Sequence, residues 1–106
     1  MLNPQSIRDL LLPGLYEAPH KARLWKDYRA ELDMRVAGDD VVISCYGPDR
    51  ERALPTGELG RSSFRAEEFE AAWDDKTLRH WFHRKIEDAI PARMLTSAAT
   101  SQRACP

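Results

Sequence analysis

The stretch Tyr28-Arg29-Ala30-Glu31-Leu32-Asp33-Met34-Arg35-Val36 alternates apolar and charged side chains without interruption. Successive side chains of a β-strand point to opposite faces of a sheet, so this pattern places the apolar groups on one face and the charges on the other. In a helix the same residues would be spread around the whole circumference. The stretch therefore predicts a strand with one buried face and one solvated face.

A second strand is predicted immediately after the first. Residues 37–40 read Ala-Gly-Asp-Asp, which is typical of a turn, and the β-branched run Val41–Tyr46 follows. Together the two strands are predicted to form an antiparallel hairpin. Residues 47–62 contain several Gly and Pro and indicate a loop. Because so long a loop is unusual in a compact domain, it either contains a short edge strand or has a function.

Helices are predicted on both sides of the hairpin. Ser6 is interpreted as the N-cap of a short helix over residues 7–12, which ends at Pro13-Gly14. Residues 20–27 fit either a helical turn or the lead-in to the first strand. After the loop, Ser62 or Ser63 caps a helix with an apolar side of Phe64, Phe69, Ala72 and Trp73. A further helix is predicted from about Lys76 to Ala89, with Leu78, Trp81, Phe82, Ile86, Ala89 and Ile90 on its apolar stripe.

The predicted fold class is α+β. A single domain over residues 1–91 contains the hairpin, with room for a third strand, and packs it against the two C-terminal helices. The buried face of the sheet is expected to present Tyr28, Leu32, Met34 and Ile43. Because a two-stranded sheet alone is only marginally stable, the helices must supply much of the core. Residues 92–106 are rich in Ala, Ser and Thr and are predicted to be a disordered tail.

Composition excludes several classes of protein. The 106 residues carry 16 Lys and Arg against 17 Asp and Glu, a formal net charge of −1, and include only 2 Cys. Such a chain is neither a disulfide scaffold nor a low-complexity segment. Its near neutrality also removes the global electrostatic argument for binding nucleic acid or an anionic membrane.

The cysteines and the N-terminus bear on the compartment. Cys45 lies in the second apolar run and is predicted to be a small buried hydrophobic residue, while Cys105 lies in the tail; nothing favours a disulfide between them. The N-terminal residues lack the pattern of a signal peptide, and no apolar run approaches the ~20 residues that cross a bilayer. We therefore expect a cytoplasmic protein without a cofactor.

Two segments, one from Val41-Val42-Ile43 through Gly47-Pro48-Asp49 and the other Glu67-Glu68-Phe69-Glu70-Ala71-Ala72-Trp73, resemble the later part of bacterial papain-like leader peptidases. The catalytic Cys of that family precedes this region, and no Cys does so here. Cys45 with His20 as its base is also a poor nucleophile, because a position within a strand lacks the positive surroundings that lower a thiol pKa. No catalytic residue is assigned.

The densest run of cations is Lys76–Lys85, which also holds Trp81 and Phe82. Cations that bind phosphate and an aromatic ring that stacks on bases are typical of a nucleic-acid surface, for which Lys76, Arg79, Arg84 and Lys85 are the candidates. The alternative is that the aromatic residues belong to the core and the cations lie on the solvated face of the helix. Neighbouring carboxylates favour this second interpretation.

The same helix carries a candidate metal site. His80, His83 and Glu87 are spaced i, i+3 and i+7, so one helix face would hold all three. Imidazole and carboxylate groups are ligands for Zn²⁺ and other transition metals. No fourth ligand is evident, and ordinary surface histidines explain the spacing equally well.

The N-terminal segment is the last candidate. Its apolar residues predict a surface that docks onto another protein or a second copy of the chain, with Ile7, Leu10, Leu11, Leu15 and Tyr16 as the contact residues. The alternative is that this segment packs on its own core. Because no catalytic constellation stands out, we expect a small non-enzymatic protein that binds a protein partner or assembles with itself. The nucleic-acid-binding regulator is the second hypothesis.

Overall fold

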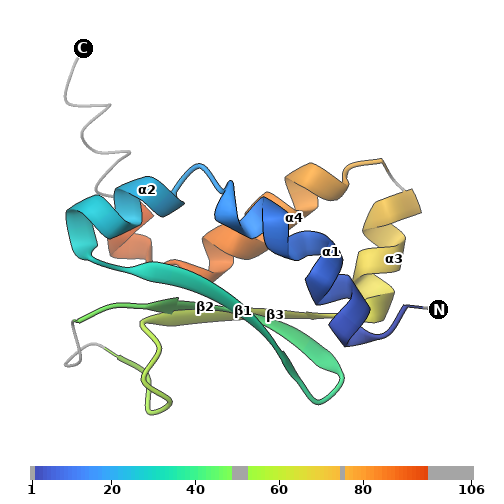
Figure 1. The fold of residues 1–106 in the computed structure, drawn as a ribbon, viewed down its shortest axis with the longest axis horizontal. Coiled ribbons are helices and arrows are strands. Elements are labelled where there is room, and N and C mark those ends of the chain that lie inside the picture. The colour runs from blue at the N-terminus through green and yellow to red at the C-terminus, as the bar shows by residue number, and fades with distance from the viewer. Residues whose placement is uncertain (1, 49–52, 75, 96–106) are drawn as a thin grey trace.

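The computed structural model describes residues 2–48, 53–74 and 76–95. Its elements follow in the order α1 (Pro4–Tyr16), α2 (Lys21–Arg23), the π-helix η1 (Leu24–Tyr28), β1 (Glu31–Ala37), β2 (Asp40–Tyr46), β3 (Gly60–Arg65), α3 (Ala66–Asp74) and α4 (Leu78–Ala89). The helices lie on one side of the sheet, so the chain forms two layers (Figure 1). The predicted α+β class is confirmed.

The sheet has three antiparallel strands in the order β1-β2-β3. Met34 lies opposite Ile43, and Ile43 lies opposite Ser62 on the third strand. Leu32, Met34 and Ile43 are at most 5% exposed. The predicted hairpin is confirmed, and its apolar residues lie on the buried face of the sheet. The third strand, β3, lies partly within residues 47–62, which were predicted to form a loop or to contain a short edge strand.

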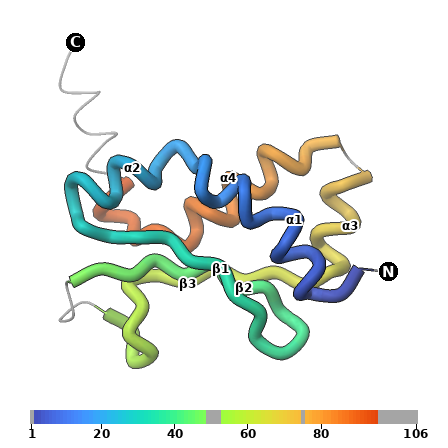
Figure 2. The backbone as a smooth tube through the Cα atoms, in the orientation of Figure 1, coloured from blue at the N-terminus to red at the C-terminus, as the bar shows by residue number. Residues whose placement is uncertain are grey.

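Two helices cover this buried face. Helix α1 contacts β1 and β2, and helix α4 contacts β2 and β3. Figure 2 follows the chain from α1 through α2 and η1 into the hairpin, and then through β3 to α3 and α4. The N-terminal helix thus packs on the sheet of its own chain, as the alternative interpretation of this segment expects, and shares with α4 the covering that was expected from the two C-terminal helices. No helix among the described residues is long and apolar enough to cross a membrane.

The first strand begins three residues later than its alternation indicates. Residues 24–28 form a π-helix, and Arg29 ends it in the left-handed region with φ 54°. The Ala30 N–H donates to the Leu24 carbonyl at 3.0 Å, which holds this end in place. Tyr28 and Arg29 continue the alternating pattern in the sequence, but Tyr28 is the last residue of the π-helix and Arg29 is its C-cap, and Leu24 at the start of that helix is fully buried.

Helix α1 is longer at both ends than the predicted helix over residues 7–12. Its N-cap is Asn3, not Ser6: the Asn3 side chain accepts a hydrogen bond from the Ser6 N–H at 2.8 Å, and Pro4 occupies the first turn. The helix also continues through Pro13 to Tyr16. Leu15 is 1% exposed and extends the buried stripe by one turn, which outweighs the hydrogen bond lost at the proline.

The predicted start of the third helix is also wrong. Ser62, Ser63 and Phe64 belong to β3, and α3 begins at Ala66. The Arg65 N–H donates to Glu68 Oε2 at 2.9 Å, so Glu68 caps the helix in place of a serine. This hydrogen bond holds the pKa of Glu68 below its ordinary value, and Lys85 of α4 at 3.3 Å adds to the effect.

The end of α4 lies very close to the start of β3. A Cβ atom on Gly60 would lie 2.2 Å from the Ala89 carbonyl oxygen, so only glycine fits at this position. Beyond Pro91 the chain is described to Leu95, and Met94 is 1% exposed. Arg23 donates to the Met94 carbonyl at 3.1 Å. The predicted tail starts at residue 92; its residues 96–106, including Cys105, lie outside the described part of the chain.

Candidate functional site

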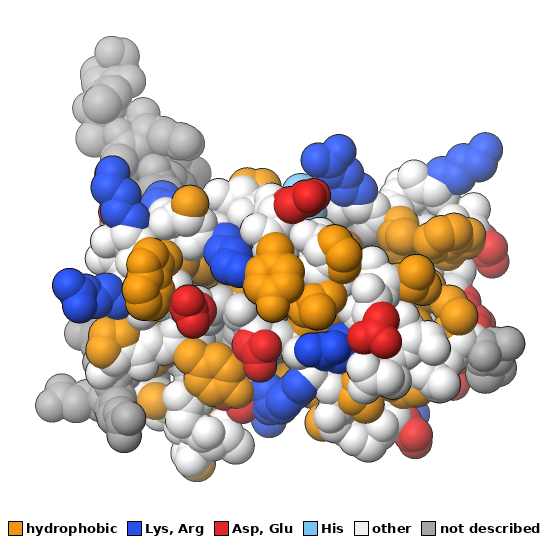
Figure 3. Space-filling model, viewed as in Figure 1, with side chains coloured by type: hydrophobic (Ala, Val, Ile, Leu, Met, Phe, Trp, Pro, Cys, Tyr) orange, Lys and Arg blue, Asp and Glu red, His pale blue; other side chains and the backbone are white. Residues whose placement is uncertain are grey.

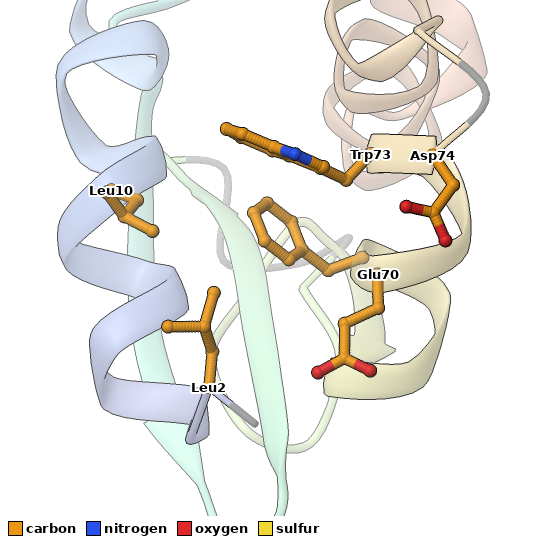
Figure 4. Close-up of a pocket in the computed structure, with 6 residues that line it drawn as sticks. Leu2, Leu10, Glu70, Trp73 and Asp74 are labelled. Atoms are coloured by element: carbon orange, nitrogen blue, oxygen red, sulfur yellow. The ribbon is translucent and has the colours of Figure 1, made fainter.

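A groove lies between α1 and α3 and encloses about 310 Å³. Its apolar lining consists of Leu2, Leu10, Phe69 and Trp73, and its polar lining of Glu70 and Asp74. Figure 4 shows the Trp73 ring reaching from α3 towards α1, with Leu2 and Leu10 on the α1 side and the two carboxylates on the α3 side. We call this feature the α1–α3 groove.

The two helices expose large apolar side chains at this groove. Ile7 and Leu11 point into the core, and Leu10 lies beside them on the neighbouring face of α1 with 57% of its surface exposed. On α3, Phe69 is 2% exposed, whereas Trp73, one turn later, is 60% exposed. The two rings remain in contact, with centroids 5.8 Å apart. Phe69 thus connects the core to Trp73, whose ring forms an apolar surface exposed to solvent.

The charges at the groove have one sign. Glu70 and Asp74 are spaced i, i+4 on α3, so both lie on the same edge of the helix. Among the described residues that line the groove, none is cationic. The C-terminus of a helix carries partial negative charge, and Asp74 is the last residue of α3, so the helix dipole adds to the negative potential there.

The structure divides the predicted N-terminal docking surface. Ile7, Leu11 and Leu15 are at most 7% exposed and lie in the core. Leu10 lines the α1–α3 groove, and Tyr16 is 60% exposed at the other end of α1, where the Lys21 ammonium lies 3.8 Å from its ring centroid. The space-filling view shows exposed hydrophobic side chains interspersed with charges over this face (Figure 3). Trp73 is not among the docking residues predicted from the sequence, because its i, i+4 spacing from Phe69 is also the spacing of a core residue.

The four predicted phosphate-binding cations do not share one environment. Lys76, Arg79 and Arg84 are exposed, but Lys85 pairs with Glu68 at 3.3 Å. Lys76 and Arg79 line a shallow hollow together with Thr77, His80 and His83. The aromatic residues are elsewhere: Phe82 is buried, and Trp81 packs edge-on against Phe64 with ring centroids 4.9 Å apart.

The three candidate metal ligands do not line one common pocket. His80 lines the shallow hollow beside Lys76, Glu87 borders a smaller pocket with His20, and His83 lines both. His20 Nε2 lies 3.7 Å from Glu87 Oε1. Within residues 2–48, 53–74 and 76–95, no group of three His, Cys, Asp or Glu side chains is arranged to hold a metal ion.

A buried polar cluster lies on the opposite face of the sheet, which sequence analysis treated as fully solvated. Glu58, 1% exposed, accepts a hydrogen bond from the Ser44 hydroxyl at 2.6 Å and pairs with Arg35 at 3.2 Å. Arg35 also donates to Ser44 Oγ and to the Tyr46 hydroxyl. Burial raises the pKa of Glu58, but hydrogen bonds from Ser44 and Thr56 and the charge of Arg35 outweigh it and hold the pKa below 4.5.

The buried members of this cluster hold a loop against the sheet. The Ser44 hydroxyl and the Glu58 carboxylate satisfy each other and are at most 1% exposed, so these two groups are closed to solvent. The cluster ties the loop that carries Glu58 to the outer face of β2, and Leu59 continues this attachment by donating to the Cys45 carbonyl at 2.7 Å. Cys45 is unpaired and fully buried, and burial raises the pKa of its thiol to about 11. The prediction of a small buried thiol is confirmed.

Comparison with known proteins identifies no relative. No family model matches the chain, and no curated protein or solved structure matches it either.

Proposed function

We propose that this chain is a non-enzymatic protein-binding module that holds a protein partner in the α1–α3 groove. One observation carries the proposal: Leu10 and Trp73, each more than half exposed, face the same apolar hollow from two different helices. Exposed apolar surface that is gathered in a hollow and bordered by charge is typical of an interaction site rather than of ordinary surface.

The size of the groove suits side-chain anchors. A cavity of about 150 Å³ accommodates one benzene molecule. The groove, at about 310 Å³, therefore has room for about two large apolar side chains of a partner. Among the described residues that line the groove there is no serine, threonine, cysteine, lysine or histidine, and its two carboxylates border an apolar surface, a chemistry that favours binding over catalysis.

Affinity capture from the native cell with matched variants tests the proposal. Leu10→Glu places a charge in the groove at an exposed position, whereas Trp25→Ser removes an aromatic residue that is 57% exposed but does not line the groove. We expect a protein that the wild type and Trp25→Ser both retain and that Leu10→Glu loses. Equal recovery by all three chains would contradict a partner at this groove. Sedimentation of the purified chain shows whether the partner is a second copy.

Nucleic-acid binding by α4 remains the second candidate, because Lys76 and Arg79 border a hollow of about 400 Å³ and Arg84 is exposed nearby. It is weaker, since neither Trp81 nor Phe82 is available for stacking on bases. If this candidate is correct, the immobilised protein should retain single-stranded DNA or RNA. The retention should fall as the salt concentration rises, and it should be lost when these three cations are changed to Glu. Absence of retention at low salt rejects it.

A further inference from the structure

We infer that the partner segment for the α1–α3 groove is an amphipathic helix whose apolar anchors are flanked by Lys or Arg. This inference rests on the proposed function, since it names the occupant of the same groove. It is carried by the shape of the groove and by the charge along one of its edges.

The shape fits a helix. The walls are the sides of two helices together with Leu2, which precedes α1. A third helix packs into such a groove when its side-chain ridges fit between those of the two helices. A partner helix would insert apolar residues spaced i, i+3 or i+4 between Leu10 and Trp73, above Phe69 on the floor. An extended strand, by contrast, gains most of its affinity from the free backbone of a sheet edge, and none of the described residues that line this groove belongs to a strand.

The charge selects the flanking residues. Glu70 and Asp74 lie on one edge of the groove, and none of the described residues that line it is cationic. Glu68, the neighbouring carboxylate on α3, is already paired with Lys85 and does not share in this edge. A partner with Lys or Arg beside its apolar anchors therefore meets two carboxylates and the negative end of the α3 dipole. An acidic partner would be repelled.

A second copy of this chain fits the groove less well. Helix α4 of a second copy presents Arg79 and Arg84, but its Phe82 and Ile86 are at most 5% exposed because they face its own core. The helical residues 21–28 present Lys26 beside one large exposed apolar residue, Trp25. The first surface thus supplies cations without anchors, and the second supplies one anchor where the groove has room for about two.

Two synthetic helical peptides of about 18 residues test the inference, a length at which helices form in water. They share one face of Leu and differ in carrying Lys or Gln at the remaining positions. Binding is followed by the NMR signal of the Trp73 indole N–H. At low salt we expect the Lys peptide to bind about three- to tenfold more tightly than the Gln peptide. The double variant Glu70→Gln/Asp74→Asn should remove this advantage, and high salt should reduce it.

The control is Glu31→Gln/Asp33→Asn, which removes the same charge from two exposed carboxylates of β1. It should leave the preference for Lys unchanged. Equal affinity for the two peptides, or equal effects of the two double variants, would overturn the inference while leaving the groove as a binding site. No change of the Trp73 signal with either peptide would overturn the proposed function as well. A dimer of the wild type that Leu10→Glu abolishes would replace the helical partner with a second copy.

Discussion

Glu58 shows how one carboxylate fixes a loop to the sheet. Its oxygens are satisfied by Ser44 and Arg35, and Arg61 lies 3.9 Å away. Glu58→Gln keeps the shape of the side chain but removes its charge, so the hydrogen bonds from Ser44 and the guanidinium weaken. We expect the free energy of unfolding to fall by about 1–3 kcal/mol. Glu31→Gln, at an exposed position of β1, should change it by less than about 0.5 kcal/mol. Urea unfolding of both variants checks this, and equal effects would contradict a stabilising role for Glu58.

The same residue predicts the direction of the pH dependence. The pKa of Glu58 in the folded chain lies below its ordinary value of 4.5, so in acid the unfolded chain takes up the proton first. The contribution of Glu58 is therefore complete above about pH 5 and is lost as the pH falls through the folded-state pKa. We expect urea midpoints measured between neutral and acid pH to fall less steeply for Glu58→Gln than for the wild type. The remaining slope includes Glu68, whose pKa is also lowered. Identical slopes would show that Glu58 does not contribute.

Gly60 is required by packing. Its missing Cβ leaves room for the Ala89 carbonyl oxygen, which would otherwise lie 2.2 Å away. The obstructing atom belongs to the backbone, so relief requires β3 and α4 to separate. Gly60→Ala should therefore lower the free energy of unfolding by about 1–3 kcal/mol, whereas Ser63→Ala, at an exposed position in the same strand, should be nearly neutral. Thermal unfolding distinguishes the two, and a neutral Gly60→Ala would mean that the contact is looser than the structure has it.

Among the elements, α1 departs furthest from its predicted form because a proline lies inside it. Pro13 cannot donate to the Asp9 carbonyl, so the helix continues without one of its hydrogen bonds. We expect Pro13→Ala to raise the free energy of unfolding by about 1 kcal/mol. The gain is reduced because proline also restricts the unfolded chain. Pro4→Ala is the matched control, since an N–H in the first turn has no partner within the helix. Chemical denaturation measures both, and a destabilising Pro13→Ala would contradict this account.

The elements that sequence analysis predicted well are those whose own pattern decides their structure. Leu32 and Met34 alternate with charges, and the second strand begins with the β-branched run Val41-Val42-Ile43, so the hairpin follows from local preference and burial. β3 was not located because its polar residues carry no alternation, and Ser62 and Ser63 equally suit a helix N-cap. Its position is decided by pairing with β2, where Phe64 lies opposite Val41. Such contacts join residues far apart in the sequence.

The candidate site was predicted only in part, for a similar reason. Apolar character identified the N-terminal segment but could not separate Leu10 from Ile7 and Leu11, because the orientation of α1 depends on where the sheet lies. Trp73 completes the groove from α3, which is far from α1 in the sequence, so no local pattern connects it with Leu10. Asn3 followed by Pro4, by contrast, is a local N-cap signal, and it marks the observed start of the helix.

Over the whole molecule the net charge is close to zero, but negative and positive charges are unevenly distributed between the neighbouring helices α3 and α4. Glu68 of α3 and Lys85 of α4 pair with each other across the helix interface. This pairing leaves Glu70 and Asp74 at the α1–α3 groove, while Arg79 and Arg84 remain exposed on α4. The molecule therefore offers an acidic apolar groove and a basic polar face. These surfaces suit different partners, so a near-zero total charge is compatible with binding at either one.

The apolar residues of α1 are divided between the core and the α1–α3 groove. Leu10 and Leu11 are adjacent in the chain, yet they are 57% and 7% exposed, respectively. The same substitution at the two positions therefore separates the two roles. Leu11→Ala leaves a cavity between α1 and the sheet and should cost about 2–5 kcal/mol of the free energy of unfolding. Leu10→Ala removes a side chain that is largely in water and should cost less than about 1 kcal/mol.

Urea unfolding measures both costs, and the Trp73 indole signal reports binding of the Lys peptide to each folded variant. We expect Leu10→Ala to weaken peptide binding with little loss of stability, and Leu11→Ala to lower stability while the molecules that remain folded still bind. If Leu10→Ala cost as much stability as Leu11→Ala, Leu10 would belong to the core and the groove would not be a free surface. The docking residues of α1 are thus distinguished from its core residues by measuring stability and binding on the same two variants.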